Sequence, residues 1–263
     1  MQNLMGRIRR CAEDYNMICA GDKIAVGVSG GKDSLSLLYL LAALRRYYPV
    51  HYDLQAVTID MGLPGMDFSP VAELCAKLDV PYQIKKTEIG PIIFEYRHEK
   101  NPCSMCAKMR RGALNDVLLE LGCNKIALGH HYDDVIETIL MGMLYGAQVQ
   151  TMMPKLHSTN FEGMELIRPL YLVREDDIKA WRDYNGLHFI QCACKFTDTC
   201  TTCNNEENRS KRVEIKQLIA NLKKVNPFVE ANIFKSVENV NLATVVAYKK
   251  DGIKHSFLDH YDE

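Results

Sequence analysis

Short apolar runs alternate with amphipathic stretches along most of this chain. Runs rich in Ile, Val and Ala, bounded by glycine, proline or charged residues, predict strands at 23–28, 52–59, 81–86, 125–128, 166–169 and 188–190. Apolar residues at helical spacing between these runs predict helices at 33–44, 69–78, 108–121, 133–145 and 174–184. Because strands that alternate with helices indicate a parallel sheet covered on both faces, we expect an α/β fold with a doubly wound sheet of about five strands.

Helical segments are also predicted at both ends of the chain. Near the N-terminus, Leu4, Ile8 and Cys11 recur at helical spacing. Near the C-terminus, helices are expected at 208–224 and 227–240. The expected division is an N-terminal helix, a sheet domain and a cysteine-containing loop with C-terminal helices, over 1–20, 21–190 and 191–263.

Composition narrows the class of protein. The 263 residues include 32 basic and 33 acidic side chains, and 47% are hydrophobic, which is typical of a globular protein and excludes a strongly basic protein that coats nucleic acid. The longest apolar stretch, at 35–44, is about half of the ~20 residues that span a bilayer. The first 19 residues lack the apolar core of a signal peptide. We therefore expect a cytoplasmic protein with no membrane partner.

A glycine-rich turn follows the first predicted strand, at Ser29, Gly30, Gly31, Lys32, Asp33 and Ser34. Adjacent glycines let the backbone turn sharply and present its N–H groups, and the following helix directs the positive end of its dipole at the same place. The spacing matches neither a Walker A loop nor a dinucleotide fingerprint. An ordinary strand–helix turn is the alternative, but the flanking strand and helix favour an anion-binding loop.

A second polar cluster follows the strand at 125–128 and comprises Gly129, His130, His131, Asp133 and Asp134. Capping of the next helix explains one of the two carboxylates. Carboxylates also suit Mg²⁺ beside a phosphate, or a general base. Because the carboxyl ends of parallel strands meet at one edge of a sheet, we favour a functional role for this cluster. For His131, a packed core histidine is an equal alternative.

Six of the ten cysteines fall in two windows, which are Cys103 with Cys106, and Cys192, Cys194, Cys200 and Cys203. In a reducing compartment, clustered cysteines more often bind metal or carry out redox chemistry than form disulfides. The first pair alone is compatible with zinc, an iron–sulfur cluster or redox chemistry. Three cations follow it and favour thiolates or contact phosphate, namely Lys108, Arg110 and Arg111.

The loop at 29–34 resembles the pyrophosphate-binding loop of the N-type ATP pyrophosphatases, and 59–61 resembles their adenosine-contacting segment. This resemblance implies an adenine-nucleotide alpha-hydrolase-like fold that binds ATP with Mg²⁺ and transfers AMP to a carbonyl oxygen. The implied nucleotide-binding residues are Ser29, Gly30, Gly31, Lys32, Asp33, Ser34, Asp60, Gly129, His130 and Asp134. Asp133 is the expected acid–base or metal-binding residue, with Asp33 in support.

Further motifs, at 102–112, 125–134, 154–156 and 167–170, resemble the tRNA 2-thiocytidine synthetases from about residue 5 to about residue 240. This resemblance implies an enzyme that adenylates the 2-oxo group of an anticodon-loop cytidine and replaces it with sulfur. It also implies a 4Fe–4S cluster on three cysteines with one open iron, and a sulfur donor such as a cysteine desulfurase. Cys103 and Cys106 match the first two cluster ligands of this family.

The sequence departs from that family at the third cluster ligand. The family has one CxxC after the last short strand, whereas this chain has Cys192 and Cys194 there and Cys200 and Cys203 beyond them. Counting back from the following helix favours Cys203, and counting forward from the strand favours Cys194. We expect Cys203, with Cys194 and Cys192 as alternatives; the surplus cysteines have zinc binding or sulfur transfer as candidate roles.

A net charge of −1 gives no overall attraction to RNA, so a tRNA substrate requires a local basic patch. The candidates are Arg7, Arg9, Arg10, Lys108, Arg110, Arg111, Arg209, Lys211, Arg212 and Lys216, although each alone is more simply part of a solvated helix face. Two other classes stay open: an ATP pyrophosphatase that ligates an amine and holds structural zinc, and a metal-dependent RNA-binding module without catalysis. A homodimer is a further option.

Overall fold

The computed structural model describes residues 2–93, 102–159, 161–185 and 211–261. They form two compact units, one drawn from 1–135 and 152–209 and the other from 136–151 and 210–263. The first unit contains the main sheet, and the second contains C-terminal helices and a hairpin. The expected domain boundaries at residues 20 and 190 stay a prediction.

Six strands form the sheet of the first unit, in the spatial order β3-β2-β1-β4-β6-β5. In chain order they are β1 (Asp22–Gly27), β2 (Tyr52–Asp60), β3 (Tyr82–Lys86), β4 (Lys125–Ala127), β5 (Lys155–His157) and β6 (Glu165–Ile167). Every neighbouring pair is parallel except β5 with β6. The predicted α/β fold is confirmed, with β5 as an added antiparallel edge strand. The strand expected at 188–190 lies outside the described residues.

Strand β1 is the point where the strand order reverses. It pairs with β2 on one side and with β4 on the other. The chain moves outward from β1 to β2 and β3, then crosses back to β4 on the far side of β1. Ligands of open α/β sheets bind beyond the carboxyl ends of the strands at such a reversal. The fold therefore places the candidate site just beyond Gly27 and Ala127.

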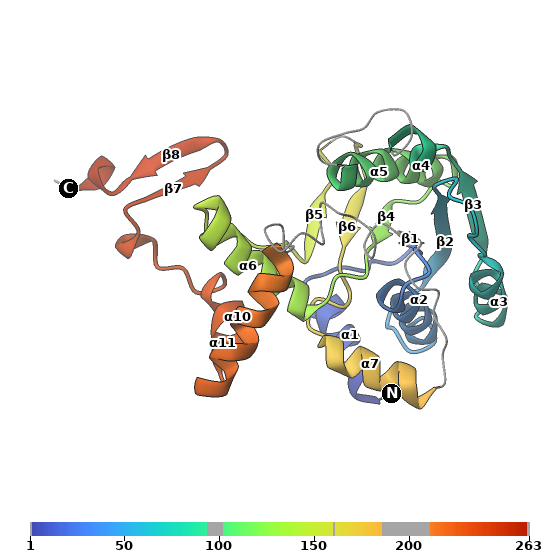
Figure 1. Cartoon of the computed structure of the whole chain (residues 1–263), viewed down its shortest axis with the longest axis horizontal. Helices are drawn as coiled ribbons and strands as arrows, with labels where there is room; N and C mark the ends of the chain where they lie inside the picture. The colour runs from blue at the N-terminus through green and yellow to red at the C-terminus, as the bar shows by residue number, and fades with distance from the viewer. Residues whose placement is uncertain (1, 94–101, 160, 186–210, 262–263) are drawn as a thin grey trace. The chain divides into compact units, whose positions relative to one another are not determined.

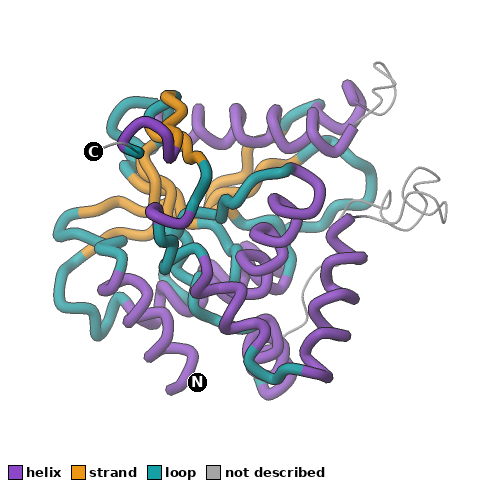
Figure 2. Tube along the Cα trace, turned by 90° about the vertical axis from the view of Figure 1, so that its left-hand side faces the viewer, coloured by secondary structure: helices purple, strands orange, loops and turns teal. Residues whose placement is uncertain are grey.

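Helices cover both faces of this sheet: α1, α2 and α7 lie on one side, and α4 and α5 on the other (Figure 1). Figure 2 shows the same layering, with the strands between helices. The helix bounds in this unit are α1 (Gln2–Asp14), α2 (Lys32–Leu44), α3 (Ser69–Lys77), α4 (Ile89–Pro91), α5 (Pro102–Glu120) and α7 (Glu175–Tyr184). Helix α2 is apolar on most of its surface because it is buried between the sheet and its neighbours.

Helix α5 starts six residues earlier than the expected 108, at Pro102. Proline suits the first helical position, because its φ is already helical and a first-turn N–H has no partner within the helix. The CxxC pair therefore lies in the first turns of α5 and not in a preceding loop.

A buried lysine stabilises the amino-terminal end of the sheet, opposite the candidate site. Lys125 Nζ lies 3.0 Å from Asp22 Oδ2 and 2.7 Å from Glu165 Oε2, and it donates to the carbonyl oxygen of Met17 at 3.0 Å. Burial opposes its charge, but the two carboxylates outweigh burial and raise the pKa of Lys125. The first residues of β1, β4 and β6, which are Asp22, Lys125 and Glu165, are thus joined by ion pairs.

The second unit begins within α6 (Tyr132–Gly146), whose first turn belongs to the first unit. Its other elements are α10 (Lys211–Val225), α11 (Val229–Ser236), the hairpin strands β7 (Ala247–Lys250) and β8 (Ile253–Ser256), and the short 3₁₀ helices η3 (Leu242–Thr244) and η4 (Phe257–His260). Glu137 on α6 is buried and lies 3.4 Å from Arg212 and 3.6 Å from Lys216 of α10. These ion pairs hold α10 on α6.

None of the described helices combines the length and apolar character needed to cross a bilayer.

Candidate nucleotide-binding site

The glycine-rich turn after β1 and the polar segment after β4 are in direct contact. A Cβ atom built on Gly129 would lie 3.0 Å from the carbonyl carbon of Asp33 and 3.1 Å from the backbone nitrogen of Ser34. Any side chain at position 129 would therefore force these two segments apart. Gly129 acts here by letting the end of β4 approach the first turn of α2.

The turn at 29–34 is held by its own hydroxyl groups. The backbone N–H of Ser29 donates to Ser34 Oγ at 3.2 Å, and Ser34 Oγ donates to the Gly31 carbonyl at 3.0 Å. Gly30 has φ +83°, a conformation that side chains other than glycine rarely adopt. Gly31 is the N-cap of α2 and supplies no side-chain cap. The first-turn N–H groups of α2 therefore have no acceptor within the helix and are suited to an anionic ligand.

Lys32 is paired with carboxylates. Its ammonium lies 2.9 Å from Asp33 Oδ2 and 3.0 Å from Glu175 Oε1. Burial opposes the charge, but these two partners outweigh it and raise the pKa of Lys32. Lys32 is thus charged at neutral pH and links the start of α2 to the start of α7.

The two consecutive aspartates of α6 have different surroundings. Asp133 Oδ2 accepts from the backbone N–H of Glu175 at 2.7 Å, and Asp133 Oδ1 lies 2.9 Å from the guanidinium of Arg174. Asp133 therefore caps the N-terminus of α7 from outside. Asp134 accepts from the backbone N–H of His131 at 3.1 Å and lines a cavity.

His131 is buried between three carboxylates. Its Nε2 lies 3.5 Å from Asp134 and 3.9 Å from Asp33, and its Nδ1 lies 3.7 Å from Asp133. The His131 ring is therefore a packed core group. It also lies next to Asp33 and Asp134, the two carboxylates that line the cavity. Its neighbour His130 lines the cavity itself.

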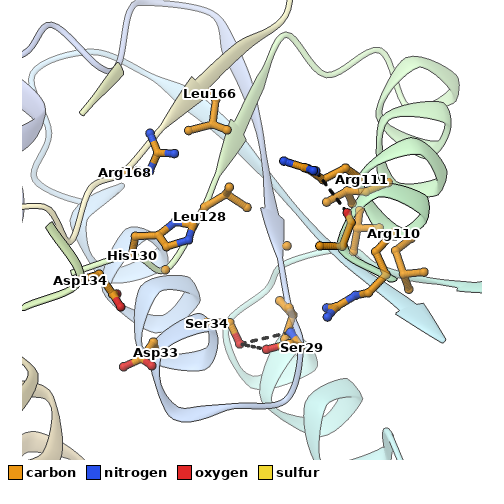
Figure 3. A pocket seen from close by; sticks show the side chains of 17 residues that line it. Ser29, Asp33, Ser34, Arg110, Arg111, Leu128, His130, Asp134, Leu166 and Arg168 are labelled. Atoms are coloured by element: carbon orange, nitrogen blue, oxygen red, sulfur yellow. Dashed lines mark hydrogen bonds between the residues drawn. The ribbon is translucent and has the colours of Figure 1, made fainter. Parts of the chain in front are cut away.

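The cavity has a volume of about 620 Å³ and lies where the switch point predicts (Figure 3). Ser29, Asp33 and Ser34 line it from the turn and α2, with His130 and Asp134 from the segment after β4. Its apolar lining comes from the strand ends and α5 and includes Val57, Ile59, Leu114, Leu128 and Leu166. The volume and the mixed lining suit a nucleotide, with polar groups for phosphate and apolar groups for a base.

Three guanidinium groups line the same cavity, from Arg110 and Arg111 of α5 and from Arg168 after β6. Arg168 donates through Nη1 to the Met153 carbonyl, whereas its buried Nε has no hydrogen-bond partner among the described residues. Burial lowers the pKa of Arg168 to about 10. A partly buried cation with one buried, unsatisfied donor atom favours an anion in the cavity. The sequence prediction missed Arg168 as a site residue, although a single arginine between an apolar strand and a proline was a usable signal.

Asp60 forms hydrogen bonds with the segments that follow β2 and β3. Its carboxylate accepts from the backbone N–H of Gly62 at 2.9 Å, and its carbonyl accepts from Thr87 Oγ1 at 2.7 Å.

Of the expected nucleotide-binding residues, Ser29, Asp33, Ser34, Gly129, His130 and Asp134 line the cavity, and Gly30, Gly31, Lys32 and Asp60 do not. The roles of all ten residues stay predictions.

The first cysteine pair lies near the same edge of the sheet. The half-buried Cys106 contacts Met61, which directly follows β2, with 3.8 Å between the two sulfur atoms. Cys103 precedes Cys106 by one turn of α5. The remaining expected ligands, Cys192, Cys194, Cys200 and Cys203, lie outside the described residues. Within the described ranges, no three Cys, His, Asp or Glu side chains converge as metal ligands.

Comparison with known proteins extends this picture. The family model described as the PP-loop domain matches residues 4–217. A Geotalea uraniireducens protein named tRNA-cytidine(32) 2-sulfurtransferase is 38% identical over 239 residues, which cover 90% of this chain and 91% of that protein. A Syntrophotalea carbinolica protein of the same name is 39% identical over 230 residues, with 86% and 85% covered.

Among solved structures, a U34-tRNA thiolase from Methanococcus maripaludis, determined with its 4Fe–4S cluster, matches with a TM-score of 0.70. The match covers 89% of this chain and 78% of that chain, at 24% identity. At this identity the likeness shows a shared fold.

Proposed function

This chain belongs to the PP-loop family and, within it, to the tRNA-cytidine 2-sulfurtransferases, and from this membership we propose that it is an ATP-dependent enzyme that thiolates a cytidine of tRNA. The observation that carries the proposal is the dual role of α5. This helix lines the nucleotide-sized cavity with Arg110 and Arg111, and it also contains Cys106 one turn earlier. A site for activation and a thiol are thus built on one helix.

ATP occupies the cavity in this proposal. The turn at 29–34 and the first turn of α2 receive its phosphates, and the base lies against the apolar side near Val57, Ile59 and Leu114. Arg168 and the two arginines of α5 neutralise charge as pyrophosphate leaves. The cytosine 2-oxo oxygen attacks the α-phosphorus, so that a C–O–AMP linkage forms and the bond to pyrophosphate breaks.

The carboxylates divide into two roles. Asp33 and Asp134 lie at the cavity and are the proposed Mg²⁺ ligands, since Mg²⁺ binds carboxylates together with substrate phosphates. Asp133 was the expected acid–base or metal residue. Its contacts with Arg174 and Glu175 support a positioning role, which aligns α6 with α7 and leaves Asp134 facing the cavity.

A 4Fe–4S cluster fits the cysteine chemistry. Cys103 and Cys106 are the proposed first two ligands, because thiolates one helical turn apart can bind irons of one cluster and the sulfur of Met61 adds a soft contact. Cys203, or else Cys194, is the proposed third ligand. When bound, the cluster supplies sulfur to the activated carbon, which forms a C–S bond as AMP leaves. A cysteine desulfurase is the proposed sulfur source, in the cytoplasm.

The decisive test uses anaerobically purified protein, undermodified tRNA, ATP, Mg²⁺ and a sulfide source. We expect pyrophosphate release that requires tRNA, and 2-thiocytidine among the digested nucleosides by mass spectrometry. The protein is expected to be brown and to contain iron and sulfide. A colourless zinc protein that joins an amine to its adenylated acceptor would contradict the proposal.

A further inference from the structure

The β7–β8 hairpin lies beyond residue 217, where the match to the family model ends. Its register places Tyr248 opposite His255 and Lys249 opposite Lys254. Side chains alternate between the faces of a strand, so the two pairs occupy opposite faces of the hairpin. One face thus presents two lysines and the other an aromatic pair.

The lysine face is unusual in electrostatic terms. Lys249 and Lys254 are exposed on this face, and Lys250 is exposed on the face of Tyr248; within the described part of the chain none of the three has an ion-pair partner. Like charges directly opposite one another destabilise an antiparallel pair. The segment 246–258 has three lysines and one aspartate, a net charge of +2, whereas the whole chain has −1. The hairpin is therefore a local cationic element in a near-neutral protein.

The other face is suited to stacking. The rings of Tyr248 and His255 lie 4.9 Å apart with an interplanar angle of 17°, and Tyr248 is exposed. Beyond β8, Phe257 and Tyr261 are 50% and 71% exposed. Aromatic side chains beside lysines are typical of surfaces that bind single-stranded or looped RNA, because bases stack on rings while cations contact phosphates.

We propose that the β7–β8 hairpin is a contact surface for tRNA, with Lys249 and Lys254 on phosphates and Tyr248 against an unstacked base or ribose. The inference rests on the proposed function, which requires an RNA substrate, and it names a surface for that substrate. A two-stranded hairpin exposed on both faces is only marginally stable in water, so a covering partner is expected. A second copy of this chain is disfavoured, because a two-fold contact here would bring like lysines together.

The test measures binding of fluorescent tRNA to the holoenzyme by anisotropy across a salt series. The double variant Lys249→Ala/Lys254→Ala should weaken binding about tenfold and lower the slope of log K against log salt by about 0.7–0.9 for each lost phosphate contact. The matched control is Lys77→Ala/Lys235→Ala, which removes the same charge from exposed positions on α3 and α11. The control should leave both affinity and slope unchanged.

Two further variants separate binding from folding. Lys249→Glu creates an opposite-charge pair with Lys254, so it should stabilise the hairpin and still weaken tRNA binding. Tyr248→Ala should weaken binding about tenfold, and Tyr248→Phe should restore it, because the ring is the proposed contact.

Unchanged tRNA affinity in the lysine variants would overturn the proposal. If the same variants instead shift the protein to a larger assembly in sedimentation, the lysines only protect an edge strand, and the proposal also fails. ATP binding and iron content report on the proposed function separately. A wild-type protein without thiolation activity whose tRNA affinity still depends on these lysines would refute the function and retain the surface.

Discussion

The carboxylate of Asp133 accepts a hydrogen bond from the backbone N–H of Glu175 at 2.7 Å, so that the second residue of α6 caps the first residue of α7. Asp134, its neighbour in sequence, lines the nucleotide cavity. We predict that Asp134→Asn reduces tRNA-dependent pyrophosphate release at least tenfold with little change in unfolding midpoint, because a charge beside the phosphates is lost while the packing stays.

Asp133→Asn is the matched comparison. Loss of a capping carboxylate and its ion pair with Arg174 should cost about 1–2 kcal/mol of unfolding free energy. Denaturant unfolding of both variants measures this difference. If Asp133→Asn abolishes pyrophosphate release at wild-type stability, Asp133 acts in the chemistry, as the sequence predicted.

A second prediction concerns Arg168. Arg168→Met keeps most of the side-chain volume and removes the charge, so it should weaken ATP binding about tenfold or more, in line with the ~1.5–3 kcal/mol typical of a hydrogen bond to a charged group. Protein stability should stay the same or rise, because a partly buried guanidinium with a buried, unsatisfied Nε is removed.

Calorimetric titration with a non-hydrolysable ATP analogue measures the affinity. Arg10→Met is the control, because Arg10 lies on α1 and pairs with Asp14 on the surface. Equal affinities of Arg168→Met and wild type would show that the nucleotide phosphates lie elsewhere.

The cysteines provide a third prediction. Cys103→Ala and Cys106→Ala should each lose iron and thiolation together while ATP binding survives, because the cluster and the nucleotide use different ligands. Cys75→Ala and Cys123→Ala are controls: both thiols are buried, and burial raises the pKa of each, for Cys75 to about 11. These controls should keep full iron content.

Four single alanine variants locate the third ligand, at Cys192, Cys194, Cys200 and Cys203. Iron and acid-labile sulfide assays should show one of them behaving like Cys106→Ala, and we expect it to be Cys203. Full iron content in all four would place the third ligand elsewhere.

The last prediction is a pH dependence of stability at the amino-terminal end of the sheet. Burial of Glu165 opposes its charge, but Lys125 and Lys155 outweigh burial, and the pKa of Glu165 falls below its ordinary value of 4.5. The carboxylate therefore stabilises the fold above about pH 4.5, and this stability is lost as the pH falls through the lowered pKa. Glu165→Gln should lower the unfolding free energy at pH 7 and weaken its dependence on pH below 4.5.

Denaturant unfolding between pH 7 and pH 3.5 measures both effects. His157→Gln is a suitable control, because His157 also faces Glu165 but is largely exposed. If Glu165→Gln and wild type lose stability in parallel below pH 4.5, other carboxylates dominate acid unfolding.

The parts of the site that could be predicted are those encoded locally. The turn at 29–34 was visible because its glycines, the preceding strand and the following helix are contiguous. The sequence assigned the acid–base or metal role to Asp133, whereas in the structure Asp134 lines the cavity and Asp133 does not, because adjacent helical residues differ in which neighbour they face only after folding. Arg168 was missed for a related reason: its burial beside the cavity depends on β6 lying next to β4.

The fold shows the same limit. Strand β5 has only three residues and depends on β6 for its pairing, so its sequence has no independent signal. The C-terminal hairpin, in contrast, has a local sequence signal in its turn. Asp251 and Gly252 adopt φ of +51° and +80°, as the central residues of a tight hairpin turn do, and Asp-Gly is a favoured pair for such turns.

The spacing of Cys106 and Arg110 on α5 has a kinetic consequence. Four helical residues advance about 6 Å along the axis, so a thiol and an arginine of the cavity keep a fixed separation. An adenylated cytidine reacts readily with water, which would return it to cytidine and waste the ATP. In the proposed mechanism, sulfur bound through Cys106 meets that carbon at a high effective molarity, whereas sulfur that diffuses in from solution competes with bulk water. The placement of Cys106 and Arg110 on one helix would therefore lower the amount of ATP that each thiolated tRNA consumes.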